Sequence, residues 1–312
     1  MLKPLQLGNL VIETPVFAAP LAGITDLPYR RILRELAPSA PLMTEMNSCH
    51  SLVQNAKAKR NSDDFSKEGL LGAQIFGADA RAMADGAKIL EQRGASWIDI
   101  NMGCPVPKVA TRALAGANLM RDHELAGRIV AAIRAAVKVP VSIKTRLGWD
   151  AAHLDSAELV RICADAGADM AIIHGRTRAQ GYSGAADWGA IARIKEKSPV
   201  PIVANGDIRT PDDISKIKRI TGCDGVMPAR ALLGNPWALS FRGLALQSRQ
   251  MTILKHLEYS IDYYGVPGGV YMFRKHLAWY SSGMAGGAVF RAKINSLIGH
   301  AEMRQAITDF FD

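Results

Sequence analysis

The sequence has few cysteines, and they lack the spacings that cysteines need for shared chemistry. The chain of 312 residues holds four, Cys49, Cys104, Cys163 and Cys223, with no Cys-x-x-Cys pair and no group of histidines close by. This argues against a disulfide framework and against a structural zinc site. Each cysteine must therefore be judged by its own surroundings.

Long apolar runs are also lacking, although 48% of the residues are hydrophobic. No run approaches the roughly 18 consecutive apolar residues that a membrane helix needs. The opening residues 1–4 lack the long apolar centre and the small-residue cleavage site of a signal peptide. We therefore expect a cytoplasmic protein with a large core and no membrane partner.

Acidic residues are too few to balance the basic ones. Lys and Arg number 38 against 29 Asp and Glu, which gives a net charge of +9. Such an excess favours a polyanionic partner without proving one. The sequence also lacks a G-x-G-x-x-G after its first apolar run, so a Rossmann fold loses its main support.

Short apolar runs alternate with amphipathic segments between about residues 15 and 230. Leu125, Ile129, Ile133 and Val137, for example, share one face at helical spacing. Eight strand-then-helix units in about 215 residues fit a (β/α)₈ TIM barrel better than a doubly wound sheet. The eight runs are 15–20, 40–46, 70–76, 97–101, 139–144, 170–174, 200–205 and 224–227.

The strand pattern ends after Trp237. Residues 240–312 have the pattern of helices broken at glycine-rich turns, with aromatic and basic side chains mixed in residues 271–280. We predict a catalytic barrel at 1–238 and an all-helical domain at 239–312. The helical part has eight Lys and Arg against five Asp and Glu, so a groove shared by the two parts could hold an extended polyanion.

In such a barrel the active site lies at the C-terminal ends of the strands, so the polar residues that close each apolar run are informative. They include too many uncharged hydrogen-bonding groups and cations for a site built on paired carboxylates. In chain order they are Pro20 with Ala22 and Gly23, Glu45 and Asn47, Gln74, Asn101 with Cys104, Lys144 and Arg146, His174 and Arg176, Asn205 to Asp207, and Ala229 with Arg230.

The last two of these groups suggest a phosphate site. Barrels often bind phosphate at the loops after strands seven and eight. Gly206 permits close approach of the backbone, and Arg230 offers a bidentate fork. Gln74, Lys144 and His174 would then face whatever the phosphate carries. Flavin mononucleotide (FMN) fits, because its ring needs amide partners at the polar edge and a cation near N1.

Each of these residues also has a structural interpretation. Lys144 could form a buried ion pair with Asp99 or Glu45, or act as a Schiff-base lysine. His174 could be a core histidine, and Gln74 could tie two strands together. The segment 205–207 is an ordinary turn sequence. Because such polar residues recur at the ends of successive predicted strands, a shared site is favoured over separate structural roles.

Among the cysteines, Cys104 is the candidate for chemistry. It directly follows the fourth run and is displayed between a glycine and a proline. Cys163 lies on the apolar face of a helix, where a cysteine packs as a small hydrophobe. Cys223 precedes the eighth run, on the side away from the barrel mouth, and Cys49 lies nearer the mouth.

The motifs resemble those of the tRNA-dihydrouridine synthases, and the resemblance is closest to the bacterial branch of that family. It extends over nearly the whole chain, and five motifs in the correct order make it specific. They are Ala-Pro-Leu-Ala-Gly-Ile-Thr-Asp at 19–26, Asp-Ile-Asn-Met-Gly-Cys-Pro at 99–105, Ser-Ile-Lys-Thr-Arg-Leu-Gly-Trp at 142–149, Ile-His-Gly-Arg-Thr at 173–177 and Val-Ala-Asn-Gly-Asp at 203–207.

The resemblance implies a TIM barrel that holds FMN, a helical RNA-binding domain, tRNA as substrate and NADPH as reductant. The reaction would reduce the C5=C6 bond of a uridine by hydride transfer from reduced FMN to C6 and protonation of C5 by Cys104. A thiol is an acid of suitable strength for that step. We expect a monomer without a metal ion.

Carried over residue by residue, the resemblance assigns one set of positions to FMN and two arginines to RNA. Arg146 and Arg176 are assigned to RNA because they adjoin matched positions. The FMN contacts would be Pro20, Leu21, Ala22, Gln74, Lys144, His174, Asn205, Gly206, Asp207, Ala229 and Arg230.

One departure from the family pattern bears on FMN affinity more than on the fold. Pro228 and Ala229 replace an isoleucine and a glycine of the usual pattern, which removes a backbone donor and restricts φ. Two other functions remain open at this point. One is an FMN-dependent reductase of a free pyrimidine, similar to a dihydroorotate dehydrogenase. The other is an RNA-binding protein built on a decayed barrel.

Overall fold

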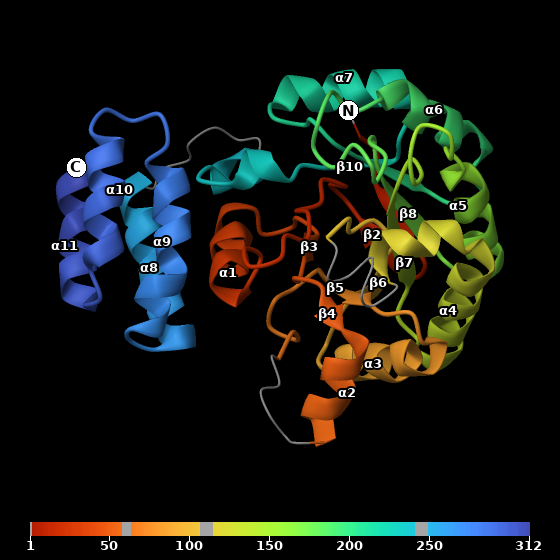
Figure 1. Ribbon diagram of the computed structural model, residues 1–312, viewed down its shortest axis with the longest axis horizontal. Coiled ribbons are helices and arrows are strands. Elements are labelled where there is room, and N and C mark those ends of the chain that lie inside the picture. Colours follow the sequence, from red (N-terminus) through yellow and green to blue (C-terminus); the bar gives the residue numbers. More distant parts are fainter. Residues whose placement is uncertain (1, 58–63, 107–114, 241–248) are drawn as a thin grey trace. The chain divides into compact units, whose positions relative to one another are not determined.

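The computed structural model describes residues 2–57, 64–106, 115–240 and 249–312. The chain forms two compact units (Figure 1). One comprises residues 1–22 and 39–229, and the other comprises residues 23–38 and 230–312. Each unit is described below on its own.

The first unit is built on a parallel sheet, as the eight apolar runs predicted. Its strands follow the order β10-β9-β8-β7-β6-β5-β3, and β4 also pairs with β5. The strands are β3 (Leu42–Met43), β4 (Asn47–Ser48), β5 (Leu71–Phe76), β6 (Trp97–Asn101), β7 (Val141–Arg146), β8 (Met170–His174), β9 (Ile202–Asn205) and β10 (Gly225–Met227). Every pairing within this sheet is parallel.

The first predicted run, 15–20, is not a regular strand, but it closes the barrel. Val226 donates its N–H to the Pro15 carbonyl at 2.9 Å and accepts from the Phe17 N–H at 2.8 Å. On the other side, the Ala18 N–H donates to the Pro41 carbonyl at 3.0 Å, just before β3. The segment therefore joins the two edges of the sheet, and the predicted TIM barrel is confirmed.

A short antiparallel hairpin that the sequence did not predict covers one end of the barrel. It consists of β1 (Leu5–Leu7) and β2 (Leu10–Ile12). Leu7 and Ile12 are buried in one cluster with Trp97 and Met170, the first residues of β6 and β8. The hairpin thus forms an apolar floor at the N-terminal ends of the strands, and the opposite end remains for the polar residues.

Helices surround the sheet (Figure 1). Side-chain caps fix where several begin: Asp79, Asp122, Asp187 and Thr210 each accept a hydrogen bond from a backbone N–H in the first turn of the helix that follows. The helices are α2 (Cys49–Lys57), α3 (Ala80–Gln92), α4 (His123–Ala136), α5 (Ser156–Asp165), α6 (Trp188–Lys197) and α7 (Pro211–Thr221), with the short η2 (Gly116–Arg121) before α4.

The second unit is helical, as predicted for the C-terminal part of the chain, but it draws in a helix from near the N-terminus. Tyr264 at the end of α8 donates to Asp26 Oδ2 at 2.9 Å, and Tyr259 of α8 donates to Glu35 of α1. The elements are α1 (Leu27–Leu36), η3 (Arg230–Leu232), η4 (Pro236–Leu239), α8 (Arg249–Tyr264), α9 (Gly268–Tyr280), α10 (Gly287–Ser296) and α11 (His300–Phe311).

These units do not coincide with the predicted division at residue 238. Packing groups 23–38 and 230–238 with the helices, whereas the sequence placed both in the barrel. The partner of α1 lies more than 200 residues away in the chain, and such a contact leaves no local sequence signal. The assignment of FMN to one part and RNA to the other remains a prediction.

A pair of buried histidines lies in the core of the second unit. His256 and His276 have ring centroids 4.5 Å apart, and both pack against Tyr29. Neither Nε2 atom has a hydrogen-bond partner within the described residues. Burial, aided by the nearby Lys275, lowers the pKa of His256 to about 3 and holds the pKa of His276 well below its usual value.

We expect this pair to make the protein less stable in mild acid. Because both pKa values are lower in the folded state than the unfolded value of about 6.5, the unfolded chain binds more protons below pH ~6.5. The free energy of unfolding should therefore fall as the pH is lowered from 6.5, by about 2 kcal/mol per histidine at pH 5. Urea unfolding followed by tryptophan fluorescence at pH 7.5 and 5.0 measures the difference.

The variant His276→Gln should show a shallower dependence of stability on pH, since glutamine does not titrate. His50→Gln, at an exposed position, is the matched control and should keep the wild-type slope. Equal slopes for the wild type and His276→Gln would contradict the assignment.

Candidate active site

Predicted polar residues from five of the strand ends meet at the mouth of the barrel. Side chains alternate along each strand, so Asp99 and Asn101 of β6 share one face. The parallel register places Gln74 beside Asp99, Asn101 beside Lys144, Arg146 beside His174, and His174 beside Asn205. Predicted site residues from five strands are therefore neighbours.

A buried hydrogen-bond network joins three of these strands. Gln74 donates through Nε2 to Asp99 Oδ2 at 2.7 Å and accepts at Oε1 from Asn101 Nδ2 at 2.8 Å. The hydroxyl of Ser142 donates to the other oxygen of Asp99 at 2.5 Å. Gln74 thus ties two strands together, which is the structural role considered for it in the sequence analysis. An amide nitrogen carries two hydrogens, so Nε2 has a second donor.

Lys144, which is partly buried, and the buried Asp99 each influence the pKa of the other. Burial, together with the nearby charge of Arg146, lowers the pKa of Lys144 to about 8, while Asp99 opposes the shift. Burial likewise raises the pKa of Asp99 to about 6 against the hydrogen bonds from Gln74 and Ser142. Lys144 Nζ donates to Asn205 Oδ1 at 3.3 Å. An ammonium has three N–H donors, so Lys144 can also serve a ligand.

Cys104 is held on a short loop directly after β6. Asn101 Oδ1 accepts from the backbone N–H groups of Gly103 at 3.2 Å and Cys104 at 2.9 Å. Arg146 Nε donates to the Gly103 carbonyl at 2.8 Å, and the Ala117 N–H donates to the Cys104 carbonyl at 3.1 Å. Cys104 is partly exposed, whereas the other three cysteines are buried. It is therefore the cysteine that solutes can reach.

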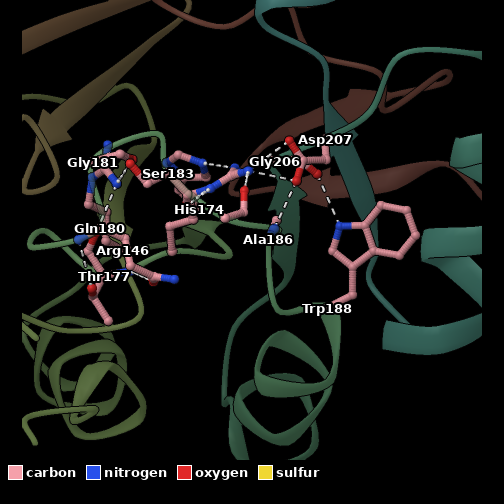
Figure 2. Close-up of polar contacts among 12 residues, drawn as sticks. Arg146, His174, Thr177, Gln180, Gly181, Ser183, Ala186, Trp188, Gly206 and Asp207 are labelled. Atoms are coloured by element: carbon pink, nitrogen blue, oxygen red, sulfur yellow. Dashed lines mark hydrogen bonds and ion pairs between the residues drawn. The ribbon is translucent and has the colours of Figure 1, made fainter. Parts of the chain in front are cut away.

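Arg146 and Arg176, the two predicted RNA contacts, are buried side chains that hold the segment after β8. Arg146 is 3% exposed and donates through Nη1 to the carbonyls of Thr177 at 3.0 Å and Gly181 at 2.8 Å. Arg176 is 2% exposed and donates to the carbonyls of Ser183 at 3.2 Å and Gly184 at 2.6 Å (Figure 2). Their guanidinium groups fix this segment, and their contact with RNA remains a prediction.

The turn after β9 packs closely against His174. Gly206 has φ +117°, and a Cβ there would lie 2.9 Å from His174 Cδ2. Asp207 has φ 54°, an uncommon conformation for a residue other than glycine. Its carboxylate accepts from Arg176 Nη2 and from the Ala186 N–H, and Trp188 Nε1 donates to the Gly206 carbonyl (Figure 2). The Asp207 carboxylate is thus engaged within the protein.

The remaining predicted FMN contacts are Pro20, Leu21, Ala22 and Ala229 in the first unit and Arg230 in the second. Pro20, Leu21 and Ala22 are exposed or partly exposed and follow the segment that closes the barrel. The Ala19 N–H donates to the Pro228 carbonyl at 3.2 Å, which makes this segment a neighbour of Ala229. Arg230 is exposed and begins η3 of the second unit.

The sequence did not single out Tyr182, although the structure places it near the site. Its ring lies 6.2 Å from the ring of His174 and 5.7 Å from the Arg146 guanidinium, and its side chain is 58% exposed. An aromatic residue in the glycine-rich segment after β8 was a signal available in the sequence. Ser142 gave no such signal, because a serine inside a strand has no distinguishing pattern.

The donor set fits a flavin better than a metal ion. The mouth offers amide groups from Gln74 and Asn205, the Lys144 ammonium and a turn that needs Gly206, which suit a polar-edged ring and a phosphate. Its buried carboxylate, Asp99, is already occupied by Gln74 and Ser142. Among the described residues, no group of three or more His, Cys, Asp or Glu could hold a metal.

The closed barrel with this mouth defines a (β/α)₈ enzyme. The fold resembles that of histamine dehydrogenase from Rhizobium sp. 4-9, with a TM-score of 0.59, 14% identity and coverage of 83% of this chain and 50% of that one. It also resembles morphinone reductase, with a TM-score of 0.56, 14% identity and coverage of 78% and 91%. At such identities the likeness concerns the fold alone.

Sequence comparison gives the family. Residues 17–312 match the profile described as dihydrouridine synthase (Dus). The chain is 37% identical over 319 residues to tRNA-dihydrouridine synthase B of Xanthomonas axonopodis pv. citri, covering 99% of this chain and 96% of the relative. It is 38% identical over 303 residues to probable tRNA-dihydrouridine synthase 1 of Synechocystis sp., covering 94% and 85%. The protein belongs to the dihydrouridine synthase family and is an oxidoreductase.

None of the described helices is long and apolar enough to span a membrane.

Proposed function

We propose that this protein reduces a uridine of tRNA to 5,6-dihydrouridine, with FMN bound at the barrel mouth and NADPH as the reductant. The family match over nearly the whole chain supports this function. The observation that carries it is the fixed loop of Cys104, held by Asn101 and Arg146 beside Lys144. A partly exposed thiol next to a cation and amide groups suits an acid at a flavin site.

The geometry of the mouth supports the residues that we propose to hold FMN. Gln74 and Lys144 would supply donors to the polar edge of the ring, and the turn at 205–207 with Ala229 would hold the phosphate. When bound and reduced, FMN supplies the hydride that adds to C6 of uracil. Cys104 Sγ then gives its proton to C5, while Asn101 and Arg146 keep the loop in place.

The uridine must leave its stack to reach this mouth, since the reacting carbons are inaccessible within a folded RNA. We assign RNA binding to the helices of 239–312 and to the positive charge of the chain. Arg146 and Arg176 already bind backbone carbonyls, so any RNA contact from them would use the few donors that remain. We expect the protein to work as a cytoplasmic monomer.

A substrate comparison tests the proposal directly. The purified protein should carry FMN, or take it up on reconstitution, and should form dihydrouridine in unmodified tRNA with NADPH. Free uracil and orotate, at the same concentration of nucleobase, should give no product. Reduction of a free pyrimidine at a similar rate would favour the dehydrogenase alternative, and a protein that never binds FMN would favour the RNA-binding one.

A further inference from the structure

We propose that Arg176 is a positioning residue that fixes His174 as the neutral tautomer with its proton on Nδ1. The tautomer is inferred from contacts within the protein and does not depend on a bound cofactor. Its consequence for the cofactor rests on the proposed FMN site, in which His174 is a contact.

The guanidinium of Arg176 is held in place on several sides. Arg176 Nη2 lies 2.7 Å from Asp207 Oδ2 and 3.0 Å from Oδ1, and the carbonyls of Ser183 and Gly184 accept from Nε and Nη2. A buried guanidinium that is paired with a carboxylate in this way keeps both its charge and its orientation. The direction of the remaining nitrogen, Nη1, is therefore set by the fold.

Arg176 Nη1 lies 3.3 Å from Nε2 of the His174 imidazole, within hydrogen-bond distance. A guanidinium has only donors and stays protonated in proteins. Two N–H groups cannot bond to each other, so His174 Nε2 must be the acceptor in this contact. The proton of the neutral ring is then on Nδ1.

The packing around the ring keeps this arrangement. His174 is 7% exposed, and the backbone of Gly206 lies so close that a Cβ there would be 3.3 Å from Nε2. The ring of Tyr182 lies beside it. The imidazole thus has little room to turn away from Arg176.

This tautomer decides what His174 can offer to a ligand. In this tautomer Nδ1 is the donor nitrogen of His174 and Nε2 the acceptor, so any hydrogen bond that the ring donates comes from Nδ1. The Asp207 carboxylate takes part through Arg176, which gives Asp207 a role in orienting His174 beside its place in the proposed FMN turn.

The test is nitrogen NMR on flavin-free protein labelled with ¹⁵N-histidine, with His174→Gln used to assign the resonance. In the wild type we expect Nδ1 to have the shift of a protonated nitrogen and Nε2 that of an unprotonated one. In Arg176→Met the proton should move at least partly to Nε2, and FMN should bind about tenfold more weakly, the effect of one lost hydrogen bond. Arg176→Lys should restore part of both.

Arg128→Met is the matched control, because Arg128 is exposed and paired only with Glu124 of its own helix among the described contacts. It should leave the tautomer and the FMN affinity unchanged. A proton on Nε2 in the wild type would overturn the proposal, even if Arg176→Met does not fold. Because the tautomer is read without FMN, a failure to bind FMN would count against the proposed function and not against this inference.

Discussion

Replacing Cys104 by alanine is expected to remove nearly all dihydrouridine formation while the protein keeps its FMN and still oxidises NADPH. Loss of a general acid lowers a rate by roughly 10²- to 10⁴-fold. The loop itself should persist, because the backbone groups of Gly103 and Cys104 hold it. The measurement is dihydrouridine per tRNA in single-turnover reactions with prereduced enzyme, alongside flavin content and NADPH consumption.

Two further variants sharpen this result. Cys104→Ser keeps the shape but offers a much weaker acid, so it should behave like the alanine variant. Cys163→Ala removes a buried cysteine away from the mouth and should retain activity. Wild-type product formation by Cys104→Ala would remove the thiol from the mechanism.

Replacing Asp99 by alanine is expected to have the largest effect on stability. Asp99 is fully buried, accepts from Gln74 and Ser142, and supports the charge of Lys144. Its loss leaves two buried donors without their acceptor, which typically costs about 1–3 kcal/mol each, and removes a negative charge that supports the Lys144 ammonium. The pKa of Lys144 should fall further, and FMN affinity should fall with it. Urea unfolding and FMN titration measure the two effects.

The isosteric Asp99→Asn should recover part of the lost stability, since an amide oxygen can still accept from Ser142. Asp85→Ala is the matched control at a partly exposed aspartate, paired with Lys88 of its own helix, and should change the free energy of unfolding by less than about 0.5 kcal/mol. If Asp99→Ala unfolds at the wild-type urea concentration, Asp99 does not stabilise the fold.

The sequence predicted the barrel because its strands are buried on both faces and therefore form continuous apolar runs. The same logic located Gln74, Lys144 and His174, since strand ends converge at one mouth. It failed for the hairpin at 5–12, whose strands have three residues each, too few to show a period. It also failed for α1, whose partner is distant in the chain.

The arginines show a different limit of sequence reasoning. Arg146 and Arg176 were assigned to RNA because they adjoin matched motif positions, yet both side chains are buried, as charged residues seldom are. Their burial depends on carbonyl groups at 177–184 that turn back toward the strand ends. A guanidinium with many donors satisfies such a turn, but the residue type alone does not reveal it.

The apolar floor at the opposite end of the barrel affects the electrostatic interactions at the mouth. Leu7 and Ile12 pack against Trp97 and exclude water from below the layer that contains Asp99. This insulation strengthens the interaction between Asp99 and Lys144, because charges act more strongly where water is excluded. A small or polar side chain at residue 7 or 12 would admit water and weaken that interaction. The charge balance of the site can thus be tuned from residues that never meet a ligand.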